Sequence, residues 1–241
     1  MKNILIISLL TSFLLTGCIT VFDKTKIKGS GTVTMEQRTV SSFDRVAVYG
    51  AFTVYLSQGD TESVSVEIDD NLQQYVSVRN EGSKLVLDNI ENVNLVKTTK
   101  NNVYITLKNI ELFDVSGVCT VKTSGSLNCD YLGFKVSGVA NGDLEMYCNK
   151  LNVNISGVAN IELRGETTEL DVNQSGVGNL NASNLNAAKA TVANSGVGSV
   201  SVYATQELSL TNSGIGSITY SGDAEIKTLN SSGIGKIKKS K

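Results

Sequence analysis

The sequence contains no histidine, no proline and no tryptophan, and it has few aromatic residues. Without histidine the chain has no histidine-based catalytic triad, no imidazole zinc site and no histidine general base. Its 21 basic and 23 acidic residues give a formal net charge of −2, so we expect no nucleic-acid partner. Glycine, serine and asparagine are abundant instead, which is typical of a β architecture with many tight corners.

The N-terminal segment has the features of a targeting sequence. An apolar run over residues 4–15 is too short for a permanent membrane-spanning helix. It ends in Leu15-Thr16-Gly17-Cys18, which resembles the bacterial lipobox, a motif whose cysteine is lipidated and becomes the new N-terminus. We expect residues 1–17 to be a lipoprotein signal peptide, Cys18 to carry the acyl anchor, and residues 18–28 to form a tether. The alternative is an ordinary secretory signal with a chance cysteine.

A Ser-Gly pair recurs along the C-terminal half with a period near twenty residues, which indicates a solenoid. Its glycines are Gly117, Gly138, Gly157, Gly176, Gly196, Gly214 and Gly233. Apolar residues alternate with polar ones around each pair, as in "IEL" and "VSV", and this pattern predicts strands with one buried face. We therefore predict an all-β chain with a right-handed parallel β-helix of about seven coils of ~19 residues over residues 113–241.

The position directly after each of these glycines holds a β-branched residue, and we expect these side chains to line the shared interior. They are Val118, Val139, Val158, Val177, Val197, Ile215 and Ile234. The Gly-x-Gly of the later repeats, as in "NSGVGSV", also resembles a phosphate-binding loop, but such a loop needs a Lys-Ser/Thr pair and a following helix. We favour a structural corner, at which the first glycine takes a positive φ and the second leaves room for the next corner.

Residues 29–112 have a different sequence pattern from the repeats. Short alternating runs such as "VEI" and "YIT" are separated by turn signals such as Gln58-Gly59-Asp60. We predict a small N-terminal β-sheet region that caps the first coil, because the end of a β-helix otherwise exposes unpaired strand backbone.

Three cysteines remain besides Cys18. Cys129 and Cys148 each lie nine residues before a corner glycine, so they occupy one column in adjacent coils. Stacked neighbours lie within reach of a disulfide, but parallel in-register geometry suits the S–S dihedral poorly, so a bridge and a buried thiol stack both stay open. Cys119 replaces Ala or Gly in its column and is expected to be an inert, small apolar residue.

Asp143 and Glu162 lie five residues after successive corner glycines and are predicted to be neighbours on an outward face. Adjacent carboxylates can act as acid and base, contact a glycan or hold calcium. The alternative, which we favour, is a solvated charge ladder balanced in part by Lys122. We predict no catalytic residue, no metal site and no cofactor.

The segments "SFDRVAVYGAFTVYLSQG", "VEIDDNLQQYVSV" and "NVYITLKNIELFDVSGV", followed by tandem "SGVAN" and "SGIGSI" repeats, resemble the head-GIN-domain putative auto-transporter adhesin family. The resemblance covers roughly residues 30–237. It implies a β-helical, secreted or surface lipoprotein, and it brings no catalytic residues with it.

We therefore expect a non-enzymatic, lipid-anchored protein of the cell envelope, at the outer membrane and facing the periplasm or the surface. A face of its β-helix would serve adhesion or scaffolding, with the membrane and glycans or envelope or host surface proteins as partners. The second hypothesis is a carbohydrate-active β-helix, a polysaccharide lyase or hydrolase that uses Asp143 and Glu162. A third is a periplasmic member of an envelope complex, and the oligomeric state stays open.

Overall fold

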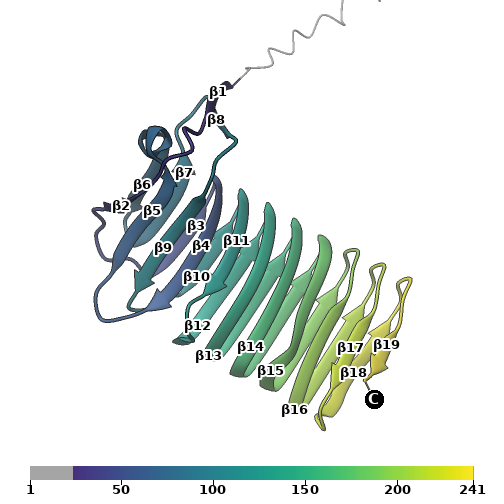
Figure 1. Cartoon of the computed structure of the whole chain (residues 1–241). Helices are drawn as coiled ribbons and strands as arrows, with labels where there is room; N and C mark the ends of the chain where they lie inside the picture. Colours follow the sequence, from purple (N-terminus) through teal and green to yellow (C-terminus); the bar gives the residue numbers. More distant parts are fainter. Residues whose placement is uncertain (1–23, 241) are drawn as a thin grey trace, which may run out of the picture.

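The computed structural model describes residues 24–240, so the predicted signal peptide and Cys18 lie outside the described residues. Figure 1 shows a small N-terminal region from which a long stack of coils runs to the C-terminus. The described chain is almost entirely β and forms a β-solenoid of about seven turns of about 19 residues, which confirms the fold expected from the repeat. Within this part of the chain, no helix has the length and apolar character needed to span a membrane.

The strands of the repeat region follow one another without helices. They are β10 (Leu112–Val115), β11 (Val118–Thr123), β12 (Leu127–Val136), β13 (Val139–Ile155), β14 (Val158–Gln174), β15 (Val177–Asn194), β16 (Val200–Asn212), β17 (Ile218–Ser221), β18 (Glu225–Ser231) and β19 (Ile237–Lys239). Consecutive coils pair as parallel strands, with like residues side by side: Val153 lies beside Val172, and Val172 beside Val192. The sequence period therefore dictates which side chains stack, at the ~4.8 Å spacing of neighbouring strands.

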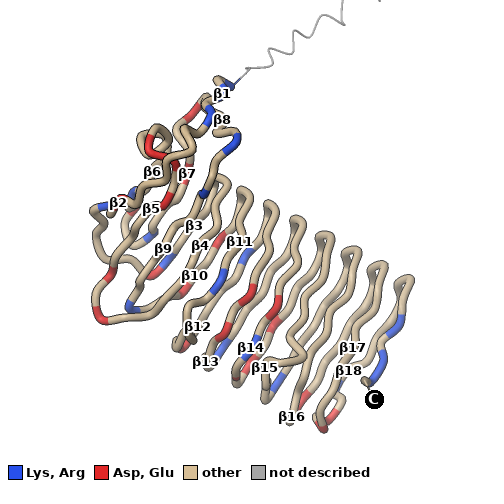
Figure 2. The backbone as a smooth tube through the Cα atoms, viewed as in Figure 1, with Lys and Arg blue, Asp and Glu red and all other residues tan. Residues whose placement is uncertain are grey.

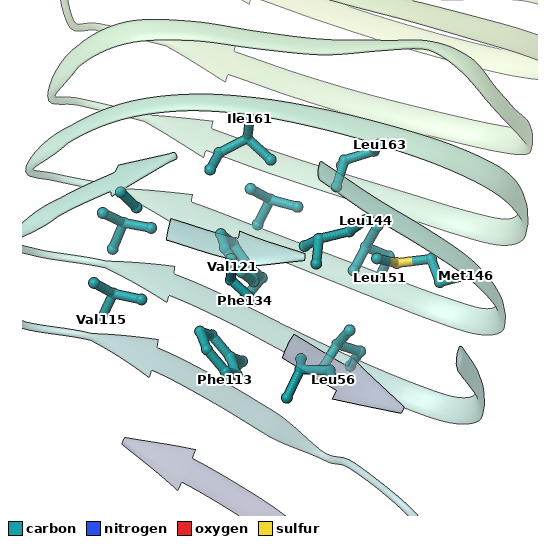
Figure 3. Packing of buried hydrophobic residues seen from close by; sticks show 14 of the residues in the cluster. Leu56, Phe113, Val115, Val121, Phe134, Leu144, Met146, Leu151, Ile161 and Leu163 are labelled. Carbon is teal, nitrogen blue, oxygen red and sulfur yellow. The ribbon is translucent and has the colours of Figure 1, made fainter. Parts of the chain in front are cut away.

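The interior of the solenoid is filled by the apolar columns on either side of each corner. Phe113 and Phe134, four residues before their glycines, are fully buried, and their rings stack with centroids 5.8 Å apart and an interplanar angle of 5°. Figure 3 shows these rings beside Val121 and Leu144, which enter the same interior from strands across the coil. Each such buried side chain contributes about 1.5–3 kcal/mol relative to an exposed one, so the columns hold the coils together.

The corner glycines are required by close packing and not, as expected from the sequence, by a positive φ. None of the seven has its φ in the left-handed region. A Cβ on Gly157 would lie 2.1 Å from the carbonyl oxygen of Gly138 in the coil before. The backbone amides of Ser156 and Gly157 both donate to the carbonyl oxygen of Val136, at 2.8 and 3.1 Å. Each corner is thus bound to the preceding one with no space for a side chain.

The second glycine of the Gly-x-Gly corners does adopt the left-handed region. The φ values are 128° at Gly178, 141° at Gly198 and 139° at Gly216. In these coils the residue two before the first glycine is a buried amide, at Gln174, Asn194 and Asn212, where the first three coils have Val or Ile. Gln174 Nε2 donates to the carbonyl oxygen of Gly178 at 2.9 Å. The glycine pair therefore belongs to a corner with its own internal amide, and the structural interpretation of "NSGVGSV" holds.

The branched residue after each corner glycine stacks as predicted, but the expectation that it faces the interior was wrong. Val158 pairs with Val177, and Val177 pairs with Val197, so the column is continuous. Their exposed fractions are 44%, 50% and 46%. The chain bends at the corner, so the alternation restarts there: the valine points outward, and the next residue, such as Ala159, is buried.

The N-terminal region contains β1 (Thr25–Lys28), β2 (Val33–Arg38), β3 (Arg45–Val48), β4 (Ala51–Gln58), β5 (Ser63–Asp69), the 3₁₀ helix η1 (Asp70–Tyr75), β6 (Val76–Glu81), β7 (Lys84–Asn89), β8 (Val93–Val96) and β9 (Asn101–Leu107). Two pairs of these strands continue the parallel stack. β3 and β4 lie beside β10 and β11, and β7 and β9 lie beside β3 and β4. The stacking therefore extends beyond residues 113–241, in an order that differs from the order along the chain.

Antiparallel strands then close the N-terminal end of the stack. β6 pairs with the outer edge of β7, β5 pairs with the outer edge of β9, and β2 pairs with β5. At the opposite end, β18 is exposed along its whole length, and Leu229, which occupies an inward column, is 51% exposed. The predicted cap is thus formed at one end by a change of strand direction, while the last described coil keeps an open edge.

Candidate functional site

Asp143 on β13 and Glu162 on β14 are neighbours in register, as predicted, and both are about half exposed. Arg164, which follows Glu162 by two residues on the same outward face, lies between them. Its Nη1 is 2.7 Å from Asp143 Oδ1 and 3.8 Å from Glu162 Oε1. The two carboxylates therefore share a cation, an arrangement that favours a solvated charge ladder over an acid–base pair. The alternation of faces along a strand places Arg164 on the same face as Glu162, so the sequence contained the signal needed to identify it.

No group of three or more Cys, Asp or Glu side chains within residues 24–240 is arranged to hold a metal ion. Asp143 and Glu162 are thus a pair without a third carboxylate ligand nearby among these residues. A glycan or calcium contact at the pair stays a prediction.

A second charged group lies on the face that leads into the corners, over β13 to β16. Lys150 Nζ is 3.0 Å from Glu169 Oε2 and 3.3 Å from Asp171 Oδ2. In the next coils, Lys189 Nζ is 3.3 Å from Glu207 Oε1. We call these five residues the ion-pair ladder. They line a shallow cavity of about 220 Å³.

Four of the five residues of the ion-pair ladder occupy one column of the repeat, seven residues before the corner glycine, in which basic and acidic residues alternate; Asp171 lies two residues after Glu169 on the same strand. The hydrogen bond from Lys150 lowers the pKa of Glu169, and the same contact raises the pKa of Lys150. Both groups therefore stay ionised near neutral pH, and the ladder presents alternating charge at strand spacing. The alternation along the column is visible in the sequence, but we did not single it out there.

The branched residues after the corner glycines form an exposed apolar line along one edge of the solenoid. We call this line the corner stripe: Val118, Val139, Val158, Val177, Val197, Ile215 and Ile234. Their exposed fractions run from 41% to 75%. From the corner serine to the third residue after the glycine, every coil is uncharged except the last, which has Lys236. Figure 2 shows this row of corners in tan between charged ends.

Comparisons with known proteins agree with this architecture. A family model described as "Putative auto-transporter adhesin, head GIN domain" matches residues 42–224. The chain belongs to this family. No curated protein matches it.

Three solved structures are similar in fold to this chain. A putative adhesin from Bacteroides fragilis is 27% identical, with a TM-score of 0.85, and the match covers 89% of this chain and 100% of that one. A putative lipid binding protein from Parabacteroides distasonis is 24% identical, with a TM-score of 0.71 and coverage of 90% and 100%. A putative adhesin from Parabacteroides merdae is 20% identical, with a TM-score of 0.70 and coverage of 90% and 100%. The last two likenesses concern the fold alone.

The cysteines of this head GIN protein lie where the repeat predicted. Cys129 and Cys148 are neighbours in register, both as free thiols. A hydrogen bond with the Cys129 thiol lowers the pKa of Cys148, whereas Cys148 and burial raise the pKa of Cys129. Cys119 is buried, and burial raises its pKa to about 12. A disulfide between Cys129 and Cys148 stays a prediction.

Membership in the head GIN family points to an adhesin-like protein of the cell surface or envelope. Cys18 lies outside the described residues, so its lipidation stays a prediction.

Proposed function

We propose that this protein is a non-enzymatic, lipid-anchored protein of the cell envelope, at the outer membrane, and that a face of its solenoid serves adhesion or scaffolding. The family description and the lipobox-like Leu15-Thr16-Gly17-Cys18 support this proposal. The partners are glycans or surface proteins of the envelope or of a host.

We choose the face with the ion-pair ladder as the binding surface because of how its charges are arranged. It places five charged groups at fixed spacing on neighbouring strands, and all five are one-third to one-half exposed. Parallel in-register coils hold these groups rigidly, so little conformational entropy is lost when a polar partner binds. A shallow, polar array of alternating charge fits glycan hydroxyls and polar protein surfaces better than an apolar ligand.

The alternative of a carbohydrate-active β-helix depends on Asp143 and Glu162. Arg164 pairs with both carboxylates, and this shared ion pair favours a structural charge ladder over an acid–base pair. If the pair were catalytic, Asp143→Asn would abolish cleavage of envelope or host glycans. The adhesion proposal expects no cleavage in either the native chain or this variant.

Digestion of intact cells with an added protease tests the location. The proposal expects fragments of the solenoid to be released from intact cells, and protection of the whole chain would contradict a surface adhesin. Binding of labelled cells to glycan or host surfaces then tests whether the ion-pair ladder is the binding face. Lys150→Ala with Lys189→Ala should weaken binding, whereas Lys135→Ala, an exposed lysine outside the ion-pair ladder, should not.

A further inference from the structure

The side chains of the corner stripe point away from the interior and are 41–75% exposed. Every one of the seven coils has Val or Ile at this position. At strand spacing the stripe is about 29 Å long. Continuous apolar surface of this kind on a single chain marks an interaction site more often than scattered exposed residues do.

The N-terminal chain leaves the fold at the same edge. Tyr49-Gly50 continues the row of corners, since Val118 N donates to the carbonyl oxygen of Gly50 at 3.0 Å. The segment between Asn89 and Asn101 arises at this corner: Asn89 N lies 3.2 Å from where a Cβ on Gly50 would be, and the Asn101 side chain donates to the carbonyl oxygen of Ala51. This segment contains β8, which pairs with β1.

Buried Asp69 fixes the β1–β8 pair, at which the N-terminal chain leaves the fold. Its carboxylate accepts hydrogen bonds from Gly31 N at 2.7 Å and from Thr99 N at 2.7 Å. Gly31 follows β1 in the chain and Thr99 follows β8, so Asp69 binds both strands of the pair at their C-terminal ends. Figure 1 shows β1 and β8 projecting beyond the end of the row of corners. Cys18 precedes Lys24 by six residues, which span at most about 20 Å. A membrane anchor at Cys18 therefore keeps the N-terminal end of this edge near the bilayer.

Lysines lie at both ends of the uncharged row. Lys24, Lys26, Lys28 and Lys97 are exposed at the N-terminal end, and Lys236, Lys238 and Lys239 are exposed at the other. Among residues 24–240, only Lys239 of this set has an acidic partner, Asp223 at 3.7 Å. Figure 2 shows both groups in blue. An anionic bilayer attracts each such lysine, by roughly fivefold in partitioning.

We propose that the corner stripe is a membrane-contact edge, by which the anchored solenoid lies along an anionic lipid bilayer. The aliphatic side chains enter the headgroup region, and the lysines at the two ends contact anionic headgroups. This inference rests on the lipid anchor of the proposed function. The ion-pair ladder lies five to seven residues before the corner glycines, back along the strands that lead into the corners, so it stays open to a partner.

A second copy of the chain fits the stripe less well. A line one side chain wide, about 29 Å by 10 Å, offers about 300 Å², well below the ~800 Å² that each partner buries in a stable dimer. A bilayer needs no such area, because the anchor already holds one end of the edge near it and the lysines add to the attraction.

Because the chain contains no tryptophan, a single introduced tryptophan reports only on its own position. The full-length lipoprotein with Val177→Trp is reconstituted in vesicles of phosphatidylcholine and phosphatidylglycerol with brominated acyl chains. The matched control is Thr168→Trp, an exposed position at the opposite corner of the preceding coil. Acylation of Cys18 is read separately by mass spectrometry and vesicle flotation. We expect bromine quenching and a blue shift for Trp at 177 but not for Trp at 168. We also expect the difference to shrink when the anionic lipid is omitted.

Three outcomes would overturn the inference. Equal quenching at both positions in an acylated, floating protein would reject the membrane-contact edge and leave the anchor intact. A chain without acyl groups that does not float would reject the anchor and the edge together. Trp at position 177 could also show a blue shift without vesicles. If that shift rises with protein concentration together with a dimer, the corner stripe binds a second copy of the chain. Circular dichroism of the two variants confirms that both substitutions leave the β-solenoid intact.

Discussion

Asn212 donates its side-chain amide to the carbonyl oxygen of Gly216 at 2.9 Å and accepts a hydrogen bond from Asn194 of the coil before, also at 2.9 Å. Both asparagines are buried. Gly216 adopts a φ of 139°, a conformation that requires glycine. The amide and the glycine are therefore parts of one unit, and coils with Ala or Cys in place of that glycine have an aliphatic residue in place of the amide.

Removal of the Asn212 amide should destabilise the solenoid. Asn212→Ala leaves the carbonyl oxygen of Gly216 and the amide of Asn194 without their partner, so we expect the free energy of unfolding to fall by about 1–3 kcal/mol. Asn173→Ala, at an exposed position, should change it by less than about 0.5 kcal/mol. Urea unfolding followed by circular dichroism measures both. Equal effects would contradict a specific role for the buried amide.

The corner glycines should be intolerant of any side chain. A Cβ on Gly176 would lie 2.0 Å from the carbonyl oxygen of Gly157, so Gly176→Ala forces the coils apart and should cost at least about 1–3 kcal/mol. Gly133 is the matched control, since a Cβ there would meet first the ends of the Leu112 and Tyr131 side chains, at 3.2 and 3.3 Å. Gly133→Ala should cost less. Similar thermal midpoints for the two variants would show that corner packing is not the constraint.

Asp69 should make the fold sensitive to acid. Burial by itself would raise the pKa of Asp69, but hydrogen bonds from Thr99 and Gly31 outweigh it and lower that pKa below its usual value. Since the folded pKa is depressed, the stabilisation is present above the unfolded pKa of about 3.9. It is lost as the pH falls below that value and through the folded pKa.

Unfolding of the native chain and of Asp69→Asn across pH 3 to 7 measures this contribution. We expect the difference in stability between the two proteins to be largest near neutral pH and to shrink toward acid. A difference that stays constant with pH would rule out ionised Asp69 as the cause. Other carboxylates with lowered pKa, such as Glu67, affect both proteins alike and cancel in the comparison.

Oxidation should join Cys129 to Cys148. With oxidised glutathione, the thiolate of one cysteine of the pair attacks the glutathione disulfide and releases one glutathione thiolate. The thiolate of the other cysteine then attacks the mixed disulfide and releases the second. Mass spectrometry of peptides without reduction should find the pair bridged and Cys119 free, since burial raises the Cys119 pKa to about 12. Cys148→Ser should leave Cys129 without a bridge, and a bridge that includes Cys119 would contradict the stacked pair.

The sequence was sufficient to predict the candidate carboxylates and cysteines as neighbours, because in-register coils place residues of the same column side by side. Asp143 beside Glu162 and Cys129 beside Cys148 both follow from counting to the nearest corner glycine. The cation between the carboxylates was missed, because the side chain of Arg164 reaches along the strand and across to the neighbouring coil. Column counting gives no information on how far a long side chain extends.

The repeat period and the residue class in each column determined the coil stack, its apolar interior and the positions of its corners, because parallel in-register strands place like residues together. The tertiary structure alone decided that the corner stripe faces outward, since the bend of the chain at each corner restarts the alternation of faces. It also decided the order of the N-terminal strands. Gly50 and Gly117 are neighbours in the row of corners although 67 residues separate them in the chain. No local pattern encodes such a pairing, because it depends on which free strand edge the chain meets.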